Sequence, residues 1–121
     1  MKIKTSDIIG AQLDWAVERS LGTPWINGYF SYPKDDPNFS YPYTSKTRPY
    51  STEWAQGGPI IEREKIGVTV DHSGVWIACS EWNYQDEKLH MHSGPTPLIA
   101  AMRCYVASKM GNEVEIPDEL A

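Results

Sequence analysis

The sequence contains only two cysteines in 121 residues, which allows at most one disulfide. Cys79 ends a strand-like segment and Cys104 lies within a helical pattern. We therefore expect two small, buried and reduced side chains rather than a disulfide pair. The chain also lacks an apolar run long enough to span a membrane, and residues 1–7 lack the apolar core of a signal peptide. These absences predict a cytoplasmic protein.

Sequence signatures of catalysis are missing as well. The chain has no Gly-x-Ser-x-Gly elbow, no phosphate-binding loop with its lysine, no Cys-x-x-Cys pair and no His-Glu-x-x-His. We therefore predict a protein that is not an enzyme and that uses no cofactor.

Basic side chains are few. Lys and Arg total 11 against 16 Asp and Glu, which gives a net charge of -5. Nonspecific nucleic-acid binding depends on neutralising phosphates, so this charge argues against it, while a small anion held by a few placed donors remains compatible.

His90 and His92 would point to one face of a strand, and His72 could add a third nitrogen ligand for zinc. Three histidines are ordinary for this length, however, and Met91 would face the core, so we predict no metal site.

The clearest folding signal lies in residues 96–111. Thr96 can cap a helix with its hydroxyl, and Pro97 suits the first helical position. Gly111 is expected to end the helix as a left-handed C′ residue. The apolar face and its flanks comprise Leu98, Met102, Tyr105 and Lys109, then Ile99, Cys104, Val106 and Met110. Such a wide apolar face predicts a helix that the rest of the chain covers.

A second helix is predicted over residues 7–19, capped by Thr5 or Ser6 and ended before Gly22. Its acidic side chains, Asp7, Asp14 and Glu18, are expected to face solvent. The inward stripe consists of Ile9, Leu13, Ala16 and Val17, with Ile8 and Trp15 at its margins. We expect the two helices to lie together on one side of a sheet.

Residues 23–50 are rich in proline and in aromatic side chains. The recurring prolines interrupt any helical or strand period. Disordered segments are poor in aromatic residues, so this composition predicts an ordered or partly ordered loop. We expect the loop to pack its rings against the body of the protein, where it can act as a lid.

The sheet is predicted within residues 59–92. Residues 51–59 are expected to form turns that lead into residues 60–64. Residues 66–70 and 75–79 alternate with period two, and residues 71–74 supply the hairpin turn between them. Residues 89–92 form a short last strand, which residues 113–116 can join. The sequence thus predicts an α+β fold in one domain spanning residues 1–121, with a small antiparallel sheet packed by an N-terminal and a C-terminal helix.

Three blocks of the sequence resemble the NinX family, which comprises small proteins of tailed phages and prophages and takes its name from the Nin region of lambdoid phages. The blocks are residues 3–7 with 13–17, the run Trp-Ala-Gln-Gly-Gly-Pro-Ile-Ile-Glu-Arg-Glu at 54–64, and residues 94–107 with 113–120. The resemblance implies a phage origin and an accessory gene, and therefore the cytoplasm of an infected bacterial host. It implies no reaction, because the family is one of unknown function.

The candidate ligand site is centred on the Gly57-Gly58 pair. Without side chains, these residues would let their backbone amides approach a ligand, and Gln56 would add a donor and an acceptor. The alternative is structural: the glycines make a tight turn, Pro59 starts an edge strand and Trp54 fills the core. The predicted ligand-binding residues are Arg48, Tyr50, Trp54, Gln56, Gly57, Gly58 and Thr96.

Two further features belong to this candidate site. Thr96 lies at a helix N-terminus, where an anion can bind, although simple capping explains it better. The aromatic rings of residues 23–50 could stack on nucleobases, and Lys34, Lys46 and Arg48 could meet phosphates, unless the loop merely covers one face of the sheet.

Three functions remain open at this stage. The first is a non-catalytic pocket protein that binds a small nucleotide-like molecule and sequesters a host defence signal. The second is an interaction module that inhibits or modulates a host or phage protein through its aromatic loop. The third is an enzyme acting on a nucleotide or phosphoester, which the absence of motifs disfavours. A sheet with so few strands also leaves a face or edge on which a homo-oligomer can form.

Overall fold

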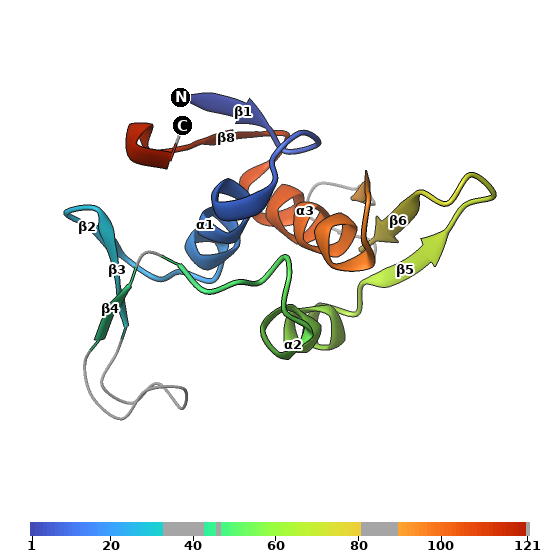
Figure 1. Ribbon diagram of the computed structural model, residues 1–121, viewed down its shortest axis with the longest axis horizontal. Coiled ribbons are helices and arrows are strands. Elements are labelled where there is room, and N and C mark those ends of the chain that lie inside the picture. Colours follow the sequence, from blue (N-terminus) through green and yellow to red (C-terminus); the bar gives the residue numbers. More distant parts are fainter. Residues whose placement is uncertain (33–42, 46, 81–89, 121) are drawn as a thin grey trace.

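The computed structural model describes residues 1–32, 43–45, 47–80 and 90–120 (Figure 1). These residues have an α+β fold, as predicted. Their elements are β1 (Lys2–Lys4), α1 (Gly10–Ser20), β2 (Trp25–Ile26), β3 (Tyr29–Tyr32), β4 (Tyr43–Ser45), α2 (Trp54–Glu64), β5 (Gly67–Val70), β6 (Trp76–Cys79), β7 (Met91–Gly94), α3 (Pro97–Met110), β8 (Glu113–Glu115) and the 3-10 turn η1 (Asp118–Leu120). None of the helices in these segments is long and apolar enough to cross a membrane.

Helix α3 forms the centre of the molecule. Its residues from Leu98 to Ala107 are all buried, so the helix is covered on every side. The Thr96 hydroxyl accepts a hydrogen bond from the Ile99 N–H at 3.1 Å, and Gly111 ends the helix with a φ of 87°. Figure 1 shows α3 between α1 and the β5–β6–β7 sheet. The C-terminal helix and its Thr96 cap are confirmed, and Gly111 ends the helix as predicted, but its ψ of -160° lies outside the left-handed helical region. Helix α1 packs on α3 and not beside it on the sheet.

Helix α1 begins later than predicted, at Gly10, and its N-cap residue Ile9 makes no side-chain capping bond. Thr5 was expected to cap it, but its hydroxyl donates to the Gly111 carbonyl at 2.7 Å and so ties the N-terminal segment to the end of α3. Ile8 is fully buried and Ile9 is 49% exposed, the reverse of the predicted stripe. Both residues lie before the first residue of α1, whereas the three residues of the predicted stripe within the helix are fully buried, as expected.

The first part of the aromatic segment forms a sheet, contrary to the expectation that proline would exclude strands. Strands β2, β3 and β4 pair in that order, with a turn at Asn27 and Gly28 where φ is 52° and 83°. The Trp25 and Phe30 rings pack against Trp15, with ring centroids 6.0 and 6.3 Å away respectively. These two rings therefore do pack on the body of the protein, whereas Tyr29 is 46% exposed. The remainder of the expected loop, residues 33–42 and 46, lies outside the described residues.

Residues 54–64 form a helix rather than the predicted turns and strand. Helix α2 contains Pro59, and Lys65 ends it in the left-handed conformation with a φ of 54°. Gly57 is buried in this helix. A Cβ at this position would lie 2.4 Å from the Tyr50 carbonyl oxygen and 2.7 Å from Leu98 Cδ2. Only glycine lets α2 approach these neighbours so closely.

The hairpin of β5 and β6 is confirmed, with β7 as the third strand of an antiparallel sheet. The last strand lies at 91–94 rather than 89–92, and residues 81–89 lie outside the described part of the chain. Strand β8 was predicted to join this sheet, but it pairs instead with β1, a strand that the sequence pattern did not reveal. Cys104 is buried, Cys79 is half-buried, and both thiols are free.

Candidate functional site

A groove lies between the first turns of α2 and α3. Its volume is about 240 Å³, and it is lined by Ser51, Thr52, Trp54, Thr96, Pro97, Leu98 and Ile99. We refer to this site as the α2–α3 groove. It brings together Trp54 and Thr96, two predicted ligand-binding residues that are far apart in the sequence. Trp54 does not fill the core, since 56% of its side chain is exposed.

The shape of the α2–α3 groove depends on the close packing at Gly57. Its missing side chain allows α2 to contact Leu98, which is 3% exposed and forms part of the groove wall. The Gly57 N–H donates to the Glu53 carbonyl at 3.0 Å as part of the helix, so it does not point to a ligand as the turn interpretation required. Gln56 and Gly58 are half-buried in the same helix and do not line the groove. Gly57 thus shapes the groove from behind.

The electrostatics of the groove come from backbone rather than from side chains. Both α2 and α3 begin there, and each helix N-terminus carries a partial positive charge of roughly half an elementary unit. Pro97 has no N–H, and the Thr96 hydroxyl already accepts from Ile99, so part of the first turn of α3 is occupied. None of the seven lining residues has an acidic, basic, histidine, cysteine or tyrosine side chain. The groove is therefore suited to binding and poor in groups that transfer protons.

Two other predicted residues, Arg48 and Tyr50, belong to a buried cluster around Glu18. Glu18 is 1% exposed, although it was expected to face solvent. Its Oε1 accepts hydrogen bonds from the Tyr32 hydroxyl at 2.6 Å and the Tyr50 hydroxyl at 2.7 Å. Its Oε2 accepts one from the Thr23 hydroxyl at 2.7 Å. Burial, followed by the charge of Glu18, raises the pKa of Tyr50, so this phenol stays protonated.

Arg48 completes the Glu18 cluster. Its Nε lies 3.8 Å from Glu18 Oε1, and its guanidinium lies 4.1 Å from the centre of the Tyr32 ring. The positive charge is thus directed at a buried carboxylate and at an aromatic face. Such a cation is already neutralised in part, so its attraction for an anionic ligand is reduced.

Asp14 is the second unexpectedly buried acid, one helical turn before Glu18. Its Oδ1 accepts the Ser51 N–H at 2.7 Å, and only 6% of the residue is exposed. Burial raises the pKa of Asp14, while the hydrogen bonds from Ser51 partly offset that rise. Asp14 and Glu18 together hold the segment 48–51, which leads into α2 and contributes Ser51 to the groove. The sequence offered no signal for this role beyond two acids spaced by four residues on a helix.

A second, larger hollow of about 450 Å³ lies near the Glu18 cluster and is lined by Leu21, Gly22, Thr23, Pro24, Ser31 and Tyr32. Its aromatic residue, Tyr32, is only 3% exposed. The hydroxyls of Tyr32 and Thr23 both donate to Glu18. This hollow therefore offers a ligand less free hydrogen-bonding capacity and less exposed ring surface than the α2–α3 groove does.

The possible histidine site for zinc finds no support in the described part of the chain, which contains no group of three His, Cys, Asp or Glu residues placed to hold a metal ion.

The comparison with known families gives a clear result. A family model described as "Bacteriophage P22, NinX" matches residues 4–109. The chain belongs to the NinX family. The match spans α1, α2 and nearly all of α3, so both walls of the groove lie within the NinX region. No curated protein sequence matches the chain.

Proposed function

We propose that this NinX-family protein is a non-catalytic binding protein for a small nucleotide-like molecule and that the α2–α3 groove is its binding site. One observation carries the proposal: the largely exposed Trp54 ring and the N-terminal turn of α3 line the same hollow. A nucleotide has an aromatic base and an anionic phosphate, which are the two groups that such a pair recognises.

Each part of the groove has a role in this proposal. The base stacks on Trp54, and the hydroxyls of Thr52 and Thr96 offer hydrogen bonds at the rim. The phosphate lies toward the first turns of α2 and α3, where the helix dipoles favour negative charge. The volume of about 240 Å³ is small compared with the roughly 300–1,000 Å³ of drug-sized sites, so we expect a mononucleotide-sized ligand that remains partly in solvent.

A binding role is favoured over an enzymatic one because acid–base catalysis needs a titratable side chain within reach of the reacting atoms. The described lining of the groove supplies none. For a phage accessory protein, tight binding without turnover suits the removal of a host signalling nucleotide used in defence. This biological role rests on family membership together with the proposed site.

Calorimetric titration with a panel of cyclic and linear nucleotides tests the proposal. We expect one member to bind, and Trp54→Ala to weaken that binding by about 1–3 kcal/mol, or roughly 5- to 150-fold, through loss of the stacking surface. Tyr29→Ala is the matched control, because Tyr29 is also an exposed aromatic residue, at 46%, but lies on the β2–β3 hairpin. Binding that is insensitive to Trp54→Ala, or no binding tighter than about millimolar, would overturn the proposal.

A second candidate function is docking to a host or phage protein through the β2–β3 hairpin. The observation that favours it is the exposure of Ile26 at 55% and Tyr29 at 46% on adjoining sides of the turn. Contiguous exposed apolar side chains are typical of protein interaction sites. In a pull-down from infected cells, Ile26→Ser with Tyr29→Ser should then release the partner while Trp54→Ala retains it.

A further inference from the structure

Hydrogen-bonded and non-hydrogen-bonded residue pairs alternate along the β5–β6 hairpin. This alternation determines which backbone N–H and C=O groups of β5 do not bond to β6. The Asp71 N–H donates to the Val75 carbonyl at 2.9 Å, and the Gly74 N–H donates to the Asp71 carbonyl at 3.1 Å. Asp71 and Val75 therefore form a hydrogen-bonded pair. Bonded and non-bonded pairs alternate in an antiparallel ladder. Given the register Val70↔Trp76, Thr69↔Ile77 and Val68↔Ala78, Thr69 bonds to β6, whereas Val68 and Val70 direct their N–H and C=O groups away from it.

The hydrogen bonds between β6 and β7 give the same alternation. The Ser80 N–H donates to the His90 carbonyl at 2.9 Å, which places Ser80 in a bonded pair with the β7 side. By the same alternation, the backbone groups of Ala78 and Trp76 bond to β7, whereas those of Ile77 and Cys79 bond to β5. Two independent sets of hydrogen bonds thus give the same outward residues on β5.

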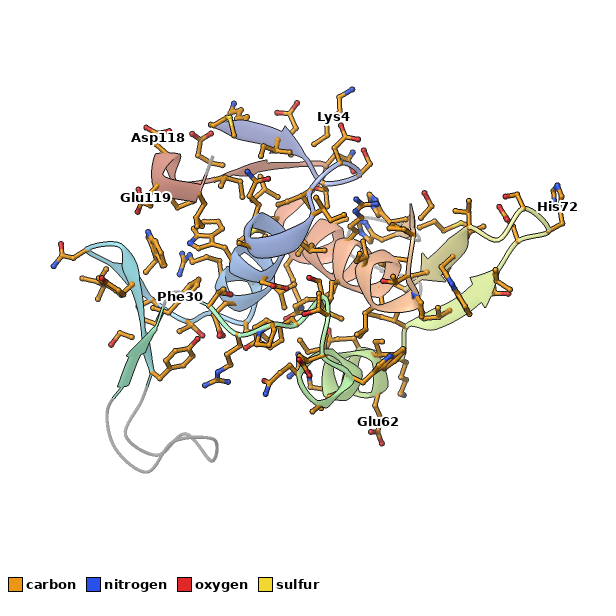
Figure 2. All side chains as sticks on the ribbon, in the orientation of Figure 1. Lys4, Phe30, Glu62, His72, Asp118 and Glu119 are labelled. Atoms are coloured by element: carbon orange, nitrogen blue, oxygen red, sulfur yellow. The ribbon has the colours of Figure 1, made fainter. Side chains whose placement is uncertain are left out.

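Strand β5 is an end strand of its sheet within the described residues. Figure 1 shows the β5–β6 hairpin extending beyond α3, and Figure 2 places His72 at its tip. The strand reads Gly-Val-Thr-Val and contains neither proline nor a charged residue, which are the usual protections of an exposed edge. Val68 packs against the core, but Val70 on the same face is 48% exposed. The hairpin therefore leaves an apolar side chain and four backbone groups without cover from the described elements.

We propose that β5 pairs antiparallel with β5 of a second copy of the chain, around a two-fold axis at Thr69. In this register Val68 of each copy faces Val70 of the other. The N–H and C=O groups of both residues that point away from β6 then all form hydrogen bonds between the two copies. Two three-stranded sheets become one of six strands, and each Val70 gains the second copy's Val68 as a neighbour.

A second copy is favoured over another partner because the edge is complementary to itself. The positively charged Lys65 precedes β5 and the negatively charged Asp71 follows it. Antiparallel pairing brings the positive end of each strand toward the negative end of the other. A dimer with two-fold symmetry requires this self-complementarity of a single patch.

Sedimentation velocity of the full chain tests the proposal. The wild-type protein should approach twice the monomer mass, and Val70→Lys should return it to the monomer, because a charged edge residue opposes strand addition. Val70 is half exposed, so this variant is expected to fold, and circular dichroism checks that it does. Ser93→Lys is the matched control, since Ser93 is exposed on the opposite edge strand β7. A monomeric wild type overturns the proposal, as does a dimer that Ser93→Lys dissociates and Val70→Lys does not.

Disulfide trapping tests the register. Thr69 would face its own copy in a non-hydrogen-bonded pair with Cα atoms about 4.5 Å apart, within the range that a disulfide spans. Thr69→Cys should give a covalent dimer on oxidation. Val70→Cys should not, because the two copies of residue 70 are offset by two positions along the strand. Equal cross-linking of both variants would contradict the two-fold axis at Thr69.

Discussion

Helices α2 and α3 begin at the same groove, yet their sequences specify them in different ways. In α3 the cap residue Thr96, the following Pro97 and the terminal Gly111 are all local signals. The structure shows Thr96 and Pro97 in their expected roles, and the helix ends at Gly111. Helix α2 instead contains two glycines and Pro59, the residues with the lowest helix propensities. Pro59 also lacks the N–H that would bond to the carbonyl four residues earlier, at a cost of about 3 kcal/mol in a helix interior.

Contacts with distant residues stabilise α2. Gly57 packs against the Tyr50 carbonyl and Leu98, and the buried acids Asp14 and Glu18 bind the segment just before the helix. The same glycine that lowers helix propensity allows this packing. Local sequence therefore defines α3, while tertiary contacts define α2, and variants of the two helices should respond differently.

The largest expected effect comes from Met102→Asp in α3. Met102 is fully buried, so the new carboxylate would lie unpaired in the core. An unpaired buried charge costs several kcal/mol against a total stability of about 5–15 kcal/mol, and a large fraction of the protein should unfold. Chemical denaturation measures the change, with Lys109→Gln in the exposed last turn of the same helix as control. A midpoint equal to that of the wild type would show that this face of α3 is not in the core.

A smaller effect is expected for two neighbouring glycines of α2, and it should have opposite signs. Gly57→Val places atoms against the Tyr50 carbonyl and Leu98, where overpacking costs about 1–3 kcal/mol or more. At Gly58 a Cβ would lie 3.7 Å from Trp54 Cε3, an ordinary contact. Gly58→Ala should therefore stabilise the protein by about 0.5–1 kcal/mol through helix propensity. Equal effects of the two substitutions on the denaturation midpoint would contradict the packing described for α2.

The smallest effect concerns Asp14 and pH. Because burial raises its pKa in the folded state above 3.8, the folded protein holds this proton more tightly than the unfolded chain does. The contribution of Asp14 to stability is thus complete below pH 3.8 and is lost as the pH rises through the folded-state pKa. Asp14→Asn should remove this loss, because the amide oxygen can still accept the Ser51 N–H. Denaturation midpoints of both proteins measured across this pH window check the prediction, and parallel pH profiles would refute it.

The parts of the fold that the sequence predicted are those with local signals. The Thr96 cap of α3 and the turn at residues 71–74 involve neighbouring residues, and both were found. The pairing of β1 with β8 joins the two ends of the chain, and no short-range pattern indicates it. Asp14 and Glu18 were assigned to solvent because acids usually lie there, and only their distant hydrogen-bond donors make their burial favourable.

The candidate site was predicted in part. Trp54 and Thr96 were named from a glycine turn and a helix cap, and the structure places both in one groove. Arg48 and Tyr50 were chosen for proximity in sequence, but their side chains turn toward Glu18. These two residues lie apart from Trp54 because the chain turns at residues 50–52, between the Glu18 cluster and the start of α2.

Native mass spectrometry of the protein purified from infected cells tests the central proposal, a ligand in the α2–α3 groove, most directly. We predict a retained small molecule with the mass of a nucleotide, which Trp54→Ala removes or depletes and Tyr29→Ala leaves in place. A wild-type protein that carries no small molecule, or a ligand that Trp54→Ala retains at the wild-type level, would contradict the account.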